Sequence, residues 1–244
     1  MTTPNDTRRA LGPVGVYLPV EFADMPPISE QREAAQRLER AGYTAIWVNE
    51  VLGKDAFTQV AALLAATDRV VFGTGIVNIW VREPQTAHAA AATLAEAYPG
   101  RFVLGLGVGY PEQARAVGRE FGSPVATLRD YLSRMSEPGA VPAPRARYPR
   151  IIGAMGPKLT ALGAEMADGT FPAMRTPEYT AETRKALGPD KLLIVGIDNA
   201  AQPQEVADQV RQHRDAGADH VVLMSSARVG LAARTEELAQ LAPE

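Results

Sequence analysis

The feature that most constrains the fold of this chain is a regular alternation of short apolar runs with helical patterns. Most of these runs are continuously apolar, as expected for strands of a parallel sheet that is covered on both faces. Between them lie helical patterns, such as one capped by Ser29 and one whose first turn holds Pro203. The eight runs cover residues 14–18, 45–48, 70–75, 102–107, 150–153, 169–171, 192–196 and 220–224.

Eight such units in 244 residues predict the α/β class and, within it, a (β/α)8 TIM barrel. A single domain over residues 1–244 fits this size, and 46% hydrophobic residues are enough for one large core. An open, doubly wound sheet is the alternative, because the number of strands does not decide whether the sheet closes.

Charge and cysteine content exclude several classes of function. The 25 basic and 28 acidic residues interleave along the chain, which argues against a nucleic-acid partner. The chain has no cysteine, and His88, His213 and His220 lack the spacing of metal ligands, so no metal site is expected. The polar start and the absence of a long apolar run predict a cytoplasmic protein without a membrane segment.

Polar residues directly follow three of the predicted strands. Glu50 ends the second run, Asn78 follows the third and Tyr110 follows the fourth. The active sites of barrels of this class lie at the carboxyl ends of the strands, so these side chains are candidates for chemistry. The alternative is that Glu50 is an ordinary loop carboxylate. Glycines at 73–75 and 105–109 either relieve crowding or let a flat ring lie against the backbone.

A second candidate site lies where the fifth predicted strand passes through a glycine turn into a helix. The turn holds Gly153 and Gly156, and Pro157 begins the helix. Free backbone N–H groups and the helix dipole favour a phosphate at such a place, and Lys158 could add charge. An ordinary βα turn explains the same pattern equally well.

Several stretches together resemble the luciferase-like monooxygenase superfamily, specifically its actinobacterial coenzyme F420-dependent oxidoreductases. The stretches are 45–50, 53–57, 73–80, 92–94, 100–108, 156–159 and 167–169. The resemblance implies a (β/α)8 barrel that is often a homodimer. It also implies a flavin or deazaflavin ring at the ends of strands two to four, with the phosphate near the turn after strand five.

The resemblance also implies roles for individual residues. Glu50 and Tyr110 are the candidate catalytic residues, as possible proton relays. It further implies a non-proline cis peptide and a β-bulge at or beside Asn78–Ile79. The candidate cofactor-binding residues are Asn49, Asn78, Ile79, Gly107, Val108, Gly109, Gly153, Ala154, Met155, Gly156, Lys158 and Thr176.

The sequence departs from the family in two places. Many relatives have a histidine where this chain has Val51, and most have a helical insertion before the last two barrel units, which is shortened here. The mouth of the barrel is therefore expected to be open.

The function implied is F420-dependent hydride transfer to a small organic substrate. The alternatives are an FMN-dependent monooxygenase and a cofactor-binding barrel without turnover. The anionic polyglutamate tail of F420 could meet Arg145, Arg147, Arg150 and Lys158, although a solvated basic loop explains the arginines as well.

Overall fold

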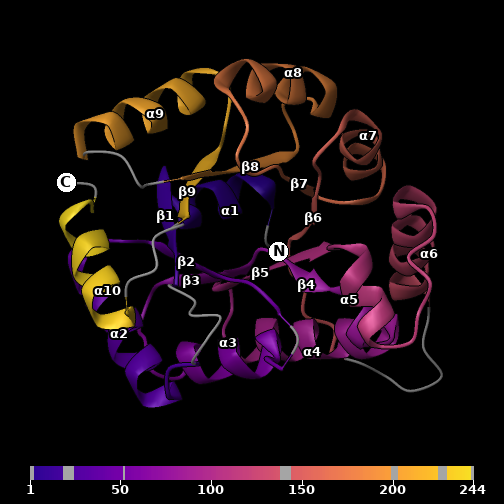
Figure 1. The fold of residues 1–244 in the computed structure, drawn as a ribbon, viewed down its shortest axis with the longest axis horizontal. Helices are drawn as coiled ribbons and strands as arrows, with labels where there is room; N and C mark the ends of the chain where they lie inside the picture. The colour runs from indigo at the N-terminus through magenta and orange to yellow at the C-terminus, as the bar shows by residue number, and fades with distance from the viewer. Residues whose placement is uncertain are drawn as a thin grey trace.

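A computed structural model of the chain describes residues 3–18, 25–51, 53–137, 144–198, 203–224 and 230–242. Its strands are parallel and form a ring that is surrounded by helices (Figure 1). The strands are β1 (Val14–Tyr17), β2 (Ala45–Val48), β3 (Val71–Thr74), β4 (Val77–Asn78), β5 (Phe102–Gly107), β6 (Arg150–Gly153), β7 (Gly169–Phe171), β8 (Leu192–Asp198) and β9 (His220–Met224).

The helices of the described residues cover the outside of the ring, except for the first. Helix α1 crosses the ring near its centre in Figure 1, immediately before β1, and so closes the amino end of the barrel. The α-helices are α1 (Pro4–Leu11), α2 (Ile28–Ala41), α3 (Ala56–Leu64), α4 (Pro84–Ala97), α5 (Pro111–Ala116), α6 (Pro124–Ser136), α7 (Pro157–Met166), α8 (Pro177–Leu187), α9 (Pro203–Asp215) and α10 (Leu231–Gln240).

The ring closes through a split strand. The sheet order runs β3-β2-β1-β9-β8-β7-β6-β5-β4, and β3 also pairs with β5. Because β3 and β4 follow each other along the same partner, the nine strands occupy eight positions. The predicted closed (β/α)8 barrel is confirmed, and the open sheet is excluded.

Two local predictions need correction. The expected cis peptide is present, but it lies at Gly75–Ile76, between β3 and β4, and not at Asn78–Ile79. Helix α2 begins at Ile28 with Pro27 at its cap position, so Ser29 lies inside the helix and does not cap it.

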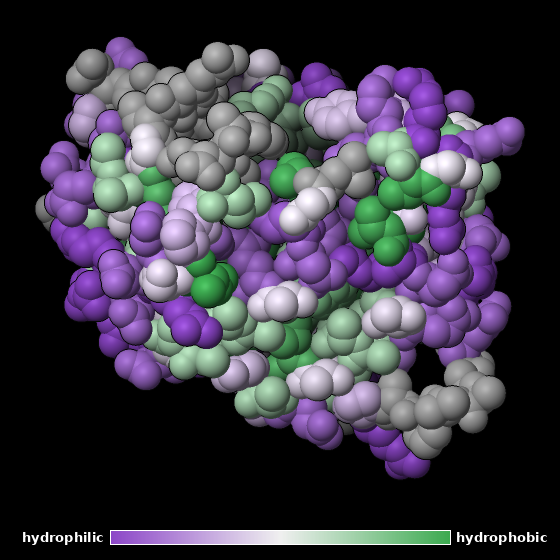
Figure 2. All heavy atoms as spheres, turned by 60° about the horizontal axis from the view of Figure 1, so that its bottom comes forward, coloured by the Kyte–Doolittle hydropathy of each residue, from purple (hydrophilic) through white to green (hydrophobic). Residues whose placement is uncertain are grey.

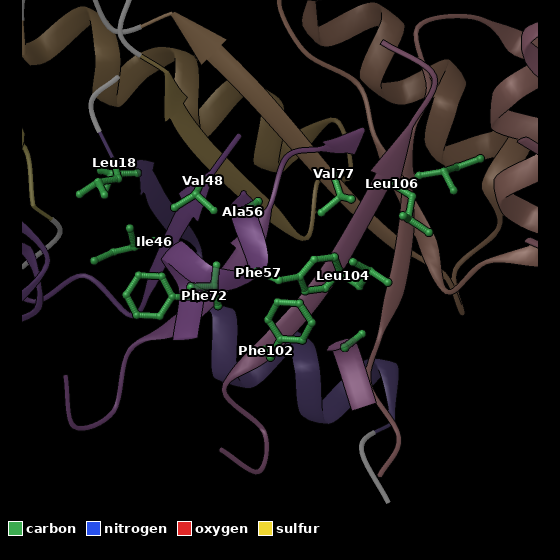
Figure 3. Close-up of a cluster of buried hydrophobic side chains, with 14 of the residues drawn as sticks. Leu18, Ile46, Val48, Ala56, Phe57, Phe72, Val77, Phe102, Leu104 and Leu106 are labelled. Carbon is green, nitrogen blue, oxygen red and sulfur yellow. The ribbon is translucent and has the colours of Figure 1, made fainter. Parts of the chain in front are cut away.

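Outside the strands, apolar side chains of the sheet pack against the helices. Figure 3 shows part of this layer, where Phe57 of α3 lies beside Phe102 of β5 with ring centroids 6.2 Å apart. Leu104 and Leu106 of β5 point into the same layer. This packing fixes the start of α3 against the sheet, and the loop that leads into α3 carries candidate residues of the site.

Inside the ring, a hydrogen-bonded chain crosses an otherwise apolar core. The Trp47 indole Nε1 donates to His220 Nε2 (3.0 Å), and His220 Nδ1 donates to the carbonyl oxygen of Gly12 (2.8 Å). Because an indole can only donate and a carbonyl can only accept, His220 is neutral with its proton on Nδ1. A side chain at Gly15 would place a Cβ 2.6 Å from His220 Nε2, so the imidazole occupies the space that this glycine leaves.

The surface is polar with scattered apolar residues. Figure 2 shows the side that carries α2, α3 and α4, where hydrophilic residues predominate and hydrophobic residues form small separate patches. Among the described residues, no helix has both the length and the apolar character needed to cross a membrane.

The buried His220 predicts a pH-dependent stability. Burial lowers its pKa from 6.5 to about 4. Between these values the unfolded chain binds a proton at this histidine and the native barrel does not. The full contribution to the free energy of unfolding is therefore present above pH 6.5, declines as the pH falls through this window, and is reduced by roughly 3 kcal/mol at pH 4.

Urea unfolding at a series of pH values tests this prediction with His220→Gln, which keeps a donor and an acceptor but does not titrate. The variant should lose less stability between pH 7 and pH 4.5 than the parent. His88→Gln is the matched control, because His88 lies half-buried beside the Tyr148 hydroxyl on the outer surface. Equal pH dependence in the parent and in His220→Gln would contradict the prediction.

Candidate active site

The Glu50 carboxylate joins the loops at the carboxyl ends of β2 and β4. Its Oε1 accepts a hydrogen bond from the backbone N–H of Ala56 (3.0 Å), at the start of α3. Its Oε2 accepts one from the backbone N–H of Asn78 (2.8 Å), in β4. The Glu50 backbone N–H in turn donates to the carbonyl of Ile76 (3.2 Å). Glu50 therefore fixes the loop after β2 against β4.

Arg82 completes the environment of Glu50. Its guanidinium donates to both carboxylate oxygens of Glu50, each at 2.6 Å, and also to Asp55 Oδ2 (2.7 Å). The side chain of Glu50 is only 2% exposed. Burial alone would lower the pKa of Arg82, but the hydrogen bonds and charges of Glu50 and Asp55 raise it above its usual value. Glu50 and Arg82 therefore form a bidentate ion pair, which is stronger than an ion pair with a single hydrogen bond.

A small cavity lies beside this ion pair. Its volume is about 170 Å³, and Glu50, Lys54, Asn78 and Arg82 are among the residues that line it. Asn78 Oδ1 accepts a hydrogen bond from the backbone N–H of Trp80 (2.9 Å), which fixes the orientation of the amide. Asn78 Nδ2 is buried and has no hydrogen-bond partner in the described part of the chain. This donor is therefore unpaired, and the protein around it shields it from the cavity.

The remaining residues that were predicted to lie beside the cofactor ring differ in their environments. A side chain at Gly107 would place its Cβ 2.1 Å from Ile76 Cδ1, so the Ile76 side chain lies over this glycine. Val108 and Ile79 belong to the buried layer between sheet and helices, and Val108 also accepts a hydrogen bond from Trp80 Nε1 through its carbonyl (2.7 Å). Gly109 has a positive φ of 54°, which turns the chain toward α5.

The two candidate catalytic residues differ in exposure, because Tyr110 is exposed and Glu50 is buried. Tyr110 is 72% exposed and caps the amino end of α5 through its backbone. Its phenol is free to meet a molecule at the rim, whereas the Glu50 carboxylate already accepts four hydrogen bonds.

The predicted phosphate turn has open donors. Gly156 is the cap residue of α7, and no side chain of the described residues caps this helix. No atom of the described part of the chain lies within 4 Å of the position that a Cβ at Gly156 would occupy. In the described residues, the backbone N–H groups of Met155, Gly156 and Lys158 have no hydrogen-bond partner. Ala154 is fully buried, Gly153 is half-buried, and the Lys158 side chain is exposed.

Two rim residues of the next loop lie beside this turn. Arg175 Nη2 donates to the carbonyl of Met155 (3.2 Å), which brings a cation to the start of α7. Thr176 is exposed, and its hydroxyl caps α8 by accepting from the backbone N–H of Tyr179. The predicted positions after β6 and β7 therefore share one region.

The arginines before β6 belong to the opposite end of the barrel. Arg150 opens β6, and its guanidinium donates to the carbonyl of Met166 (3.0 Å) and to Ser136 Oγ (3.3 Å). Gly153, at the mouth, is three residues further along the strand. Since Arg145 and Arg147 precede Arg150, these three residues do not join Lys158 in one basic patch.

The sequence interpretation missed three charged residues of the site, namely Arg82, Arg175 and Lys54. Arg82 lies 32 positions from its partner Glu50, so no local spacing connects them. Lys54 donates to Asn49 Oδ1 (3.1 Å) at the edge of the cavity. The only available signal was their position shortly after predicted strands.

Fold and site together define a (β/α)8 barrel with a polar cavity and an uncapped helix start at its carboxyl end. Residues 10–188, well over half of the chain, match the family described as luciferase-like monooxygenase. The chain belongs to this family, and the resemblance in the sequence is confirmed.

Two relatives illustrate the sequence similarity. The chain is 30% identical over 183 residues to the Mycobacterium tuberculosis protein named "Putative coenzyme F420-dependent oxidoreductase Rv3520c", with 62% of this chain and 53% of that protein covered. It is 28% identical over 173 residues to an F420-dependent glucose-6-phosphate dehydrogenase of Nakamurella multipartita, with 58% and 51% covered. The chain spans about half the length of these relatives.

Solved structures show the same fold. An F420-dependent secondary alcohol dehydrogenase in complex with an F420-acetone adduct superposes with a TM-score of 0.77 at 16% identity, covering 93% of this chain and 97% of that one. The oxygenating constituent of 3,6-diketocamphane monooxygenase in complex with FMN, from Pseudomonas putida, gives 0.61 at 13% identity, covering 86% and 65%. At these identities the likeness concerns the fold alone.

The Glu50–Arg82 pair predicts a large stability effect. In Arg82→Met the Glu50 carboxylate stays buried without its cation, so the free energy of unfolding should fall by about 3–5 kcal/mol. The double variant Glu50→Gln/Arg82→Met removes the uncompensated charge and should recover part of that loss. Urea unfolding at pH 7 measures all three proteins.

Arg129→Met is the matched control, because the Arg129–Glu165 pair lies exposed between α6 and α7. Its removal should leave the unfolding midpoint almost unchanged. If Arg82→Met behaved like this control, the pair would not hold the loops together.

Proposed function

We propose that the protein is an F420-dependent oxidoreductase that transfers hydride between the deazaflavin and a small organic substrate. The observation that carries the proposal is the uncapped start of α7, with its open backbone donors, at the carboxyl end of a luciferase-family barrel. Asn78 Nδ2, at the end of β4, is a buried second donor without a partner among the described residues. The names of the two relatives, which are F420-dependent, support the choice of cofactor.

The residues of the site fit the chemical parts of such a cofactor. Ile76 over Gly107 offers an apolar surface to one ring face. The backbone N–H groups of Gly156 and Lys158 would hold the phosphate, since a helix start favours an anion. When bound, the deazaflavin supplies or takes up the hydride, and the protein orients it and the substrate.

Among the two candidate catalytic residues, Tyr110 is the better placed to exchange a proton. Its hydroxyl is exposed at the rim, and a tyrosine is normally a donor at neutral pH. Glu50 would act mainly as a positioning residue, because all its acceptor positions face protein donors.

An FMN-dependent monooxygenase is the alternative function, supported by the FMN complex among the related folds. Because the insertion is shortened, a barrel that binds the cofactor without turning over a substrate is a further alternative. The proposal further includes a single domain over residues 1–244, a cytoplasmic location, a small-molecule substrate, and a homodimer that binds neither nucleic acid nor membrane.

Equilibrium titration with F420 and with FMN tests the proposed cofactor. F420 should bind more tightly and change its absorbance on binding. Tighter binding of FMN would favour the alternative function. No spectral change with either compound would mean that the barrel binds neither F420 nor FMN.

A substitution at Gly156 separates cofactor binding from folding. Gly156→Asp fits the open space there, and aspartate is a good helix cap, so stability should be kept or raised. Its carboxylate would occupy the free N–H groups and repel a phosphate, so the Kd for F420 should rise at least about tenfold, or about 1.4 kcal/mol. Gly156→Ala is the control and should bind almost as the parent does. Equal affinity of both variants would place the phosphate elsewhere.

A further inference from the structure

The hydroxyl of Tyr17 lies inside the barrel and has no hydrogen-bond partner in the described part of the chain. Tyr17 ends β1, and its ring belongs to the apolar cluster that fills the inside of the barrel. Its Oη is not among the unpaired polar atoms that the described protein shields completely, whereas Asn78 Nδ2 is. The residue is 7% exposed. Tyr17 therefore offers a donor that a ligand can reach, which Asn78 does not.

The strand register places this hydroxyl on the mouth side of the inner layer. Tyr17 pairs with Trp47, and Trp47 pairs with Gly73 of β3, so the three residues lie at one level. A side chain at Gly75 would collide with Tyr17 Oη and with the ring of Phe171. Gly75 lies two residues beyond Gly73 in the direction of the carboxyl ends of the strands. The phenol of Tyr17 therefore extends from its own level toward the mouth.

The same hydroxyl lies beside the apolar surface that we assign to the cofactor ring. Ile76 directly follows Gly75, and its side chain lies over Gly107 of β5. A Cβ at Gly153 of β6 would lie 3.3 Å from Ile76 Cγ2, so the Ile76 side chain bridges the ends of these two strands. Ile76 is half-buried and thus presents part of this surface to solvent. A flat ring that covers Ile76 and extends toward β1 meets the Tyr17 hydroxyl with its edge.

The surroundings of Tyr17 favour an uncharged acceptor. The ring of Phe171 lies beside it, with centroids 6.4 Å apart, and Phe171 and the sulfur of Met224 fill the space next to Gly196. Burial raises the pKa of the Tyr17 phenol above its usual value, so the group stays protonated at physiological pH. An ionised ligand group would lose its hydration among these apolar side chains, whereas a carbonyl oxygen needs only one donor.

We propose that Tyr17 is a further cofactor-binding residue, whose hydroxyl donates a hydrogen bond to a carbonyl oxygen of the deazaflavin ring. The carbonyl groups of such a ring belong to its pyrimidine part, which then points toward β1. The inference rests on the proposed function, since it assigns a residue to the same cofactor. Contact with Ile76 has no direction of its own, whereas a hydrogen bond fixes the ring within its plane.

Tyr17→Phe tests the proposal, because it removes the hydroxyl and keeps the ring. The hydroxyl has no partner in the described protein, so the urea midpoint of the variant should equal or exceed that of the parent. The Kd for F420 should rise about fivefold, as the loss of one neutral hydrogen bond predicts. In resonance Raman spectra of bound F420, the carbonyl stretch should move to higher frequency. A merely structural tyrosine would change neither the Kd nor this frequency.

Tyr43→Phe is the matched control. The buried Tyr43 hydroxyl donates to the carbonyl of Leu238 (2.8 Å), far along the chain and outside the inner layer. Its removal should lower the urea midpoint and leave the Kd and the carbonyl frequency of bound F420 unchanged. If Tyr17→Phe bound F420 with the affinity of the parent, or left the carbonyl frequency unchanged, the proposal would be overturned.

A second probe separates this proposal from the proposed function. The deazaflavin ring with its ribityl chain but without the phosphate should lose affinity for Tyr17→Phe by the same factor as F420. Gly156→Asp should bind this probe as the parent does. Tighter binding of FMN to the parent would overturn the proposed function alone, because FMN carries the same carbonyl groups and Tyr17→Phe is then compared with FMN. Binding of neither cofactor to the parent would refute the proposed function and this inference together.

Discussion

The Glu50 carboxylate is the contact on which this side of the barrel mouth depends. It accepts hydrogen bonds from the start of α3, from β4 and from Arg82, so three segments meet at one buried group. The same contacts use all its lone pairs, while Lys54 lines the cavity beside it and donates to Asn49. A single ion pair thus shapes this side of the mouth.

The strands were predictable because their signal is local. Parallel strands covered on both faces read as short apolar runs, and all eight predicted runs coincide with strands. Helix α1 was missed, although Thr3, Pro4 and Asp6 form a capping box with proline in the first turn. The start of α2 was misplaced because Ser29, a residue type favoured at helix caps, was taken as the cap, whereas the helix begins at Ile28. Closure depends on the pairing of β3 with β5, which no local pattern encodes.

The site was only partly predictable for the same reason. Residues directly after strands, such as Glu50, Asn78 and Tyr110, were found because the ends of parallel strands share one edge. Their partners were not found, because Arg82 and Arg175 reach them through the folded structure. Arg150 was grouped with Lys158 from proximity in sequence, although the length of β6 separates them. Position along a strand predicts a side chain's place better than it predicts its partners.

Hydrogen exchange of backbone amides, with and without F420, tests most directly that ligands bind at the carboxyl end of this barrel. The account predicts slower exchange in three segments, 49–58, 107–113 and 153–160, which surround the cavity and the start of α7. It predicts no change at residues 8–13 and 144–150, which lie at the amino end. Protection of the amino end, or none at the start of α7, would contradict it.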